Sequence, residues 1–78
     1  MSNLNSNNFI AIVKRSNNEF IGYDCSASLD YCSVKDYVSN GKRVFKARTK
    51  QEAIEFAYNV DFCEFGFFFV NKRGKQIK

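Results

Sequence analysis

The chain has 78 residues, a net charge of +4 and a hydrophobic fraction of 45%, values typical of one small folded domain rather than of a disordered chain. It contains no His, Pro or Trp, and the missing His removes the commonest general base, the commonest transition-metal ligand and every Ser-His or Cys-His nucleophile pair. No apolar run in the sequence approaches the roughly 20 residues that span a bilayer, so no membrane partner is expected.

The three cysteines lack the paired spacing of a structural zinc site, and no secretory signal precedes them. We therefore expect a reduced, cytoplasmic protein with no metal, no other cofactor and no small-molecule substrate. The carboxylates are scattered along the chain and nothing marks a cleft for paired acid-base work, so an enzyme is not expected.

The N-terminal third predicts a β-hairpin after a frayed end. Residues 1–8 are expected to be frayed, and residues 9–78 are expected to form a single domain. Phe9–Val13 and Phe20–Cys25 are β-rich runs, and residues 16–18 between them are a turn signal. The second run places three side chains on one face of the sheet: Ile21, Tyr23 and Cys25.

Residues 28–39 allow two interpretations. A short helix over Leu29–Val38 would begin at Ser28, because Tyr31, Val34 and Val38 fall near one helical face. A strand would instead lead into Asn40-Gly41, a dipeptide suited to a two-residue hairpin turn. We favour an irregular or helical start followed by a strand at about residues 34–39.

One strong helix is predicted in the second half of the chain, after a strand at Val44–Ala47. Thr49 and Glu52 have the spacing of a capping box, in which the threonine oxygen accepts from the Glu52 amide and the glutamate accepts from the threonine amide. The helix should end near Asn59. Its apolar stripe comprises Ala53, Ile54, Phe56, Ala57 and Val60.

The C-terminal run Phe65–Val70 predicts a strand that is apolar on both faces, because successive side chains of a strand alternate. Residues 71–74 are then expected to form a tight turn with a glycine available for positive φ, and residues 75–78 a short edge strand. The aromatic runs can fill an ordinary core between the sheet and the helix, but one helix covers only one sheet face well. Ile10, Ile12, Phe68 and Val70 are harder to bury, and if they align on central strands they would form a contiguous apolar patch on the other face.

This order of elements predicts an α+β fold. The expected architecture is a small two-layer domain, in which an antiparallel sheet of four to five strands carries one main helix in the order β-β-β-α-β-β. No internal repeat or linker interrupts it.

Positive and negative charges are segregated along the chain. Residues 42–50 carry five bases and no acid, residues 51–64 carry four acids and no base, and residues 72–78 carry four bases. The two basic segments could neutralise several phosphates along one rim. One alternative function is therefore that of a small basic nucleic-acid-binding protein, with candidate residues Lys42, Arg43, Lys46, Arg48, Lys72, Arg73 and Lys75.

The stretch Phe45–Ala57, a strand followed by a capped helix, resembles a unit found in many small phage and mobile-element proteins. With its small size and its Asn-, Lys-, Phe- and Ile-rich composition, the chain is similar in style to phage anti-defence proteins such as anti-CRISPR inhibitors. The resemblance covers thirteen of 78 residues. It implies action without catalysis, in the host cytoplasm, by occupying the working surface of a host nuclease.

The leading prediction is a small non-enzymatic binding protein that inhibits or modulates a host protein or nucleoprotein complex. The second apolar face and the tyrosines would supply affinity, and the segregated charges would set orientation. A homodimer paired through the aromatic strand is compatible with either function. The predicted partner-binding residues are Tyr23, Lys46, Arg48, Phe68 and Val70.

Overall fold

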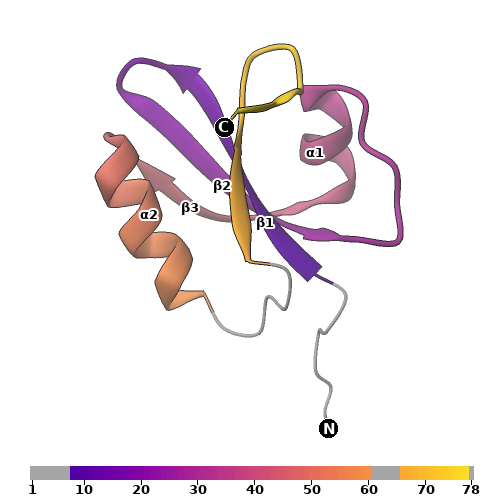
Figure 1. Ribbon diagram of the computed structural model, residues 1–78, viewed down its shortest axis with the longest axis horizontal. Coiled ribbons are helices and arrows are strands. Elements are labelled where there is room, and N and C mark those ends of the chain that lie inside the picture. Colours follow the sequence, from indigo (N-terminus) through magenta and orange to yellow (C-terminus); the bar gives the residue numbers. More distant parts are fainter. Residues whose placement is uncertain (1–7, 61–65, 78) are drawn as a thin grey trace, which may run out of the picture.

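The computed structural model describes residues 8–60 and 66–77 (Figure 1). In this part of the chain the elements follow in the order β1 (Asn8–Ser16), β2 (Glu19–Ser26), α1 (Val34–Asn40), β3 (Lys42–Ala47), α2 (Lys50–Asn59), β4 (Phe67–Val70) and β5 (Gln76–Ile77). The α+β class and the five-stranded sheet are as predicted. Most of the expected frayed end, residues 1–7, lies outside the described residues, as does Phe65.

The sheet is mixed rather than purely antiparallel, so that part of the prediction is wrong. Its strand order is β3-β2-β1-β4-β5, and β1 pairs with β4 in parallel while the other pairs are antiparallel. The reason lies in α2. β3 runs in the same direction as β1, α2 carries the chain back along the sheet, and the next strand then starts at the same end again.

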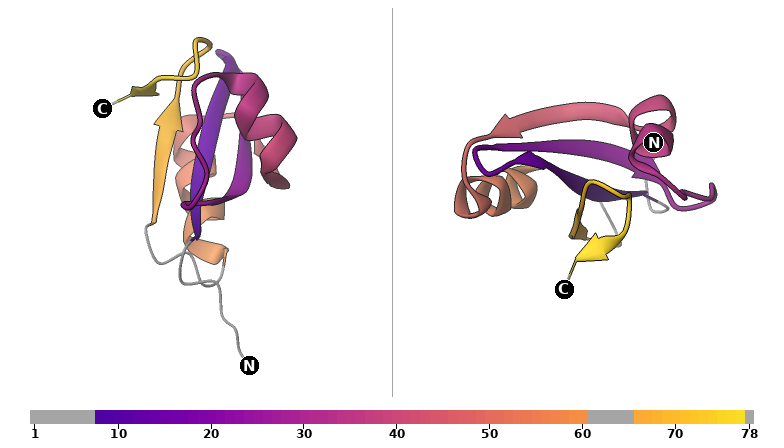
Figure 2. Two further views of the ribbon diagram at one scale, coloured as in Figure 1. Left: turned by 90° about the vertical axis from the view of Figure 1, so that its right-hand side faces the viewer. Right: turned by 90° about the horizontal axis from the view of Figure 1, so that it is seen from above.

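The two helices lie on opposite faces of the sheet (Figure 2). On one face, Tyr37 of α1 packs into a core with Phe9, Ala11, Val13, Ile21, Tyr23, Cys25 and Val70. On the other face, two alanines of α2 pack into a second core, formed by Ala53, Ala57, Ile10, Ile12, Phe20 and Ala47. The sheet is thus the middle layer, with a helix on each side.

The expected apolar patch is not exposed. Ile10 and Ile12 lie on the α2 face, whereas Phe68 and Val70 lie on the α1 face, so the four side chains do not align. Ile10, Ile12 and Val70 are at most 1% exposed. The second sheet face, for which the sequence predicted no covering helix, is covered by α1.

α1 also replaces the strand that we predicted at residues 34–39. A helix was the alternative interpretation, but it begins at Val34 and not at Leu29. Gly41 follows the helix with an extended backbone (φ −94°), and its N–H donates to the Tyr37 carbonyl (2.9 Å). Asn40-Gly41 therefore ends a helix and does not form a hairpin turn.

Each helix has an acidic residue in its first turn that accepts backbone N–H groups. In α1, Asp36 Oδ2 accepts from the Ser33 N–H (3.2 Å). In α2, Thr49 Oγ1 accepts from the Glu52 N–H (3.0 Å), as predicted, whereas Glu52 Oε1 accepts from the Arg48 N–H (2.8 Å) and not from that of Thr49. Both carboxylates satisfy donors that the helix itself leaves unpaired.

The β4–β5 turn packs against the start of α1 and requires a glycine for two reasons. Gly74 has a φ of +82°, in the left-handed region that L-residues rarely adopt. A Cβ at this position would also lie 2.5 Å from Ser33 Cα. The tight turn predicted at residues 71–74 and the short edge strand after it are thus confirmed.

Candidate functional site

One end of the sheet gathers most of the positive charge. Val13 of β1 lies opposite Ile21 of β2 and Val70 of β4, and Phe20 of β2 lies opposite Ala47 of β3. The segments next to these positions therefore emerge at the same end. This end, called the basic end below, carries eight of the twelve Lys and Arg residues: Lys14, Arg15, Lys46, Arg48, Lys50, Lys72, Arg73 and Lys75.

The carboxylates near the basic end are already engaged. Glu19 Oε2 lies 3.5 Å from Lys46 Nζ, and the carboxylates of Glu52 and Asp36 accept backbone N–H groups. Within residues 8–60 and 66–77, the other bases of this end have no carboxylate partner. The basic end therefore presents positive charge that the surrounding side chains do not compensate.

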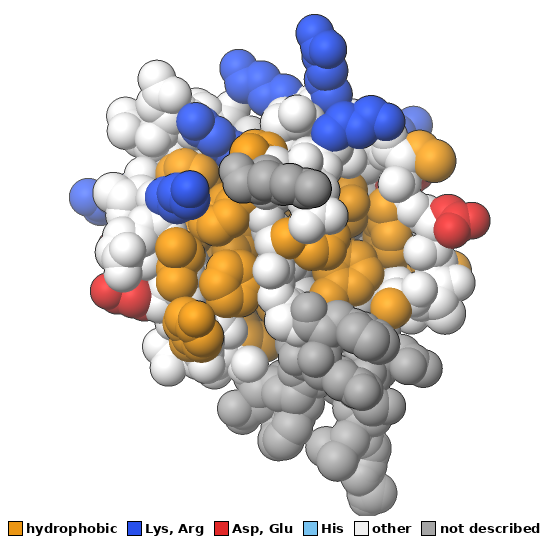
Figure 3. All heavy atoms as spheres, in the orientation of Figure 1, with side chains coloured by type: hydrophobic (Ala, Val, Ile, Leu, Met, Phe, Trp, Pro, Cys, Tyr) orange, Lys and Arg blue, Asp and Glu red, His pale blue; other side chains and the backbone are white. Residues whose placement is uncertain are grey.

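The charge is visible on the molecular surface. In Figure 3 the Lys and Arg side chains line the top and upper left of the view, where the β1–β2 and β4–β5 turns and the start of α2 lie. Acidic side chains on this face are confined to its two sides. The basic end thus forms one front that holds bases from both basic segments, with uncharged side chains between them.

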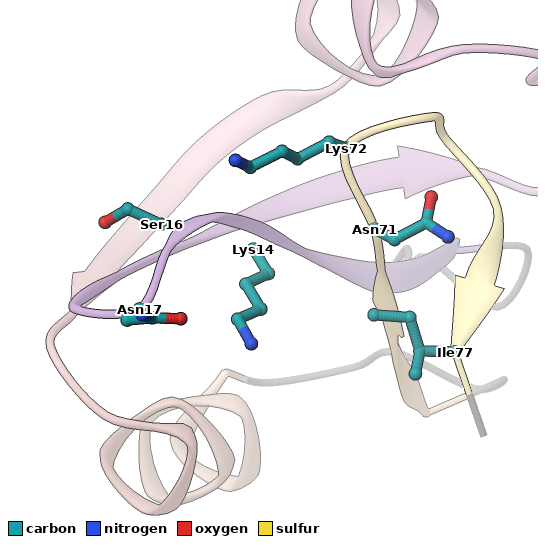
Figure 4. Close-up of a pocket in the computed structure, with 6 residues that line it drawn as sticks. All are labelled: Lys14, Ser16, Asn17, Asn71, Lys72 and Ile77. Carbon is teal, nitrogen blue, oxygen red and sulfur yellow. The ribbon is translucent and has the colours of Figure 1, made fainter.

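An open pocket of about 430 Å³ lies in this front (Figure 4). Lys14 of β1 and Lys72 of the β4–β5 turn contribute to its wall, and Figure 4 shows the two side chains extending in different directions. Asn71 Oδ1 accepts from the N–H groups of Arg73 (2.9 Å) and Lys75 (3.0 Å), which holds the turn that carries Lys72. Two diverging ammonium groups suit a chain of phosphates better than a single small anion.

The five predicted partner-binding residues fall into two groups. Lys46 and Arg48 lie at the basic end and are exposed. Tyr23 (6% exposed) and Val70 (0%) are buried in the α1-face core, so the expectation that they lie on an exposed face is wrong. Phe68 is half-buried against the same core.

The seven candidate nucleic-acid-binding residues are divided by the fold. Lys42 and Arg43 lie at the far end of β3, opposite Asp24 and Tyr23 of β2, and so outside the basic end. The other five lie within it, but on opposite edges of the sheet, because β3 and β5 are the two edge strands. They are Lys46, Arg48, Lys72, Arg73 and Lys75.

Lys14 and Arg15 join these two groups, and sequence reasoning missed them. They close β1, which lies between the two edges of the sheet. In the sequence they directly follow the β-rich run Phe9–Val13 and lie outside both basic segments. The available signal was a pair of bases beside a turn rich in Ser and Asn, a composition that supplies hydrogen-bond donors next to positive charge.

Partly exposed rings lie beside the basic end on the α2 face. Lys50 Nζ lies 5.3 Å from the ring centroid of Phe69. The centroid of Phe67 lies 6.4 Å from that of Phe69 and 5.5 Å from that of Tyr58, which is 77% exposed. These three rings, Phe69, Phe67 and Tyr58, are called the aromatic row below.

The described residues do not assemble a metal centre. No group of three His, Cys, Asp or Glu side chains that could hold a metal ion occurs among them. Desolvation by burial raises the pKa of Tyr31 and of Tyr37, and both belong to the α1 face rather than to the basic end. In the same part of the chain, neither helix has the length and apolar character needed to cross a membrane.

No protein-family model, curated protein or solved structure matches this chain. A small α+β arrangement does not by itself indicate a function, because one fold carries many. The features of this fold that bear on function are the basic end and the surface beside it.

Proposed function

We propose that this protein is a small non-enzymatic binding protein whose basic end docks on the phosphate backbone of a nucleic acid. The observation that carries the proposal is the gathering of eight bases at one end of the sheet, with the nearby carboxylates engaged elsewhere. Lys and Arg side chains that neutralise phosphates release counterions, which supplies affinity without base recognition. Ser16 and Asn17 beside Lys14 add hydrogen-bond donors for phosphate and sugar oxygens.

The width of the basic end sets the number of phosphates within reach. Neighbouring strands lie about 4.8 Å apart, so the edge strands β3 and β5 of this five-stranded sheet are separated by about 19 Å. At about 3.4 Å of duplex axis for each phosphate of one strand, this front faces about five or six phosphates of a duplex. Affinity for a duplex should then fall roughly 1,000-fold between about 50 and 200 mM salt, because each phosphate contact contributes about 0.9 to the logarithmic salt slope.

A charge-reversal pair with a matched control tests the proposal. Arg48→Glu with Lys72→Glu removes two bases from the basic end, and Lys42→Glu with Arg43→Glu removes two from the opposite end of β3. All four side chains are exposed, so both variants should fold, and both change the net charge equally. At about 100 mM salt we expect the first variant to bind a labelled oligonucleotide roughly 30-fold more weakly, because each lost contact removes about 0.7–0.9 from the logarithmic salt slope.

The control variant should retain most of the affinity and the full salt slope, since its substitutions lie away from the basic end. Equal losses in both variants would mean that only net charge matters and that no docking surface exists. Absence of salt-sensitive binding by the unmodified protein would refute the proposal.

Inhibition or modulation of a host protein or nucleoprotein complex, as in phage anti-defence proteins, stays a prediction. The side chains of its expected apolar contact surface are divided between the two cores, which removes the feature on which it chiefly relied. Its charged residues, Lys46 and Arg48, belong to the basic end. A protein that binds no free nucleic acid but captures an acidic host protein through these residues would favour this function over the one proposed.

A further inference from the structure

We infer that the nucleic acid is single-stranded and that its bases stack on the aromatic row next to the basic end. The inference rests on the proposed function and deepens it by choosing between a duplex and a single strand. Two contacts join the phosphate-binding surface to the rings. Lys50 of the basic end lies over the Phe69 ring, and ring contacts continue from Phe69 through Phe67 to Tyr58.

The rings remain accessible because of how α2 covers its face. The side chains that α2 buries are Ala53 and Ala57, and the helix packs mainly over β2 and β3, while its Lys50 and Tyr58 side chains contact the rings of β4. Phe67 and Phe69 on β4 therefore remain partly exposed. The Tyr58 and Phe67 rings form a T-shaped contact with an interplanar angle of 84°. Tyr58 is 77% exposed, so most of its ring faces solvent.

A duplex would make no use of these rings, because its bases are already stacked and paired. A single strand has free base faces, and proteins that bind single strands combine a positive groove for the backbone with aromatic platforms for the bases. The same combination lies here on adjoining surfaces of β4 and α2. Charge complementarity also favours a nucleic acid over an apolar peptide, because Lys50 of the basic end lies over Phe69, the first ring of the aromatic row.

Tyr58→Ala tests the inference, compared on one oligonucleotide in single-stranded and duplex form. Because a stacked base contributes substantially to affinity, we expect roughly 10-fold weaker binding of the single strand and less than about 2-fold change for the duplex. Tyr58→Phe should retain the affinity, since it keeps the ring. Val38→Ala, which removes an exposed apolar side chain from α1 on the other face, is the matched control and should leave both affinities unchanged.

Three results would overturn the inference while leaving the proposed function standing. The unmodified protein could bind the duplex more tightly than the single strand, or Tyr58→Ala could leave single-strand binding unchanged while the Arg48/Lys72 reversal abolishes it. A dimer that Tyr58→Ala converts to monomer, seen in the mass in solution, would make the aromatic row a contact between copies. Absence of binding to either form would refute the proposed function and the inference together.

Discussion

The two faces of the sheet are covered in opposite ways. α1 has seven residues, yet it closes its face, because it contributes Tyr37, which stacks on Tyr31 (ring centroids 4.7 Å apart, interplanar angle 12°). α2 has ten residues but buries only Ala53 and Ala57, while Phe56 is 37% exposed. Coverage of a sheet face therefore depends on the size of the side chains that point toward it more than on the length of the helix.

The difference assigns separate tasks to the two faces. Large buried rings on the α1 face remove much apolar surface from water, so this face should carry more of the stability. Small residues on the α2 face leave the rings of β4 within reach of a ligand, next to the basic end. Substitutions of aromatic residues on the α1 face should then mainly lower stability, and those on the α2 face should mainly weaken binding.

The largest expected effect is that of Tyr37→Ala on the α1 face. Tyr37 is 5% exposed, and its truncation leaves a cavity and removes the stacking on Tyr31. Removal of a buried aromatic side chain typically lowers the free energy of unfolding by about 3–5 kcal/mol. For a domain of this size that is a large share of the total stability, so urea denaturation should show the variant partly unfolded in water.

Tyr58→Ala provides the matched comparison on the α2 face. Its ring is 77% exposed, and we expect a loss of less than about 1 kcal/mol, the scale of one aromatic contact. The comparison of the two faces would be wrong if the two alanine variants lost similar amounts of stability.

Effects smaller than that of Tyr37→Ala are expected at the glycines on either side of β4. Gly74→Ala combines a positive φ with a Cβ placed 2.5 Å from the backbone of Ser33 at the start of α1, so we expect a loss of about 2–3 kcal/mol. Gly66 also has a positive φ (+73°), but nothing lies within 4 Å of its Cβ position. Gly66→Ala should therefore lower the free energy of unfolding by only about 1 kcal/mol, the cost of holding a residue with a Cβ at positive φ. Thermal melts measure both, and equal losses would show that the contact with α1 contributes nothing.

The sequence predicted what is encoded within a few residues. The hairpin turn between β1 and β2, the N-cap at Thr49 and the positive-φ turn at Gly74 each rest on local spacing, and the structure has all three. Signals at residues 28–39 were in conflict, because the tyrosine and valine spacing favoured a helix and Asn40-Gly41 favoured a hairpin. Packing decided between them, since the helix places Tyr37 in the core beside Tyr23.

The candidate site was predicted only in part, because its assembly depends on long-range register. The bases after β3 and after β4 are visible in the sequence as two segments. Only the pairing of Val13 with Val70 brings the second segment next to Lys14 and Arg15, and the length of β3 places Lys42 at the opposite end of the sheet from Ala47. A parallel pairing across a helical crossover leaves no local signal in the sequence. Composition alone therefore could not show which bases belong to the basic end.

The smallest expected effect is a decline of stability at alkaline pH that originates on the α1 face. Desolvation by burial raises the pKa of Tyr37 above its ordinary value of 10.0, and the nearby Cys25, Asp36 and Cys32 raise it further, because all of these disfavour the phenolate. As the pH rises past about 10, the unfolded chain releases this proton while the folded protein keeps it, so the unfolded state binds fewer protons and stability falls. Tyr37→Phe keeps the ring and should make that decline shallower, although Tyr31, whose pKa burial also raises, preserves part of it.

Urea unfolding at several values between about pH 8 and pH 11 measures this decline. Tyr58→Phe is the control, because this ring is 77% exposed and lies outside the α1-face core, and the variant should leave the decline as steep as in the unmodified protein. If Tyr58→Phe flattened the curve and Tyr37→Phe did not, the buried α1 face would not be the origin of the alkaline instability. The division of stability between the two faces would then have to be reassigned, because the same tyrosine that closes the α1 face is the group whose ionisation should open it.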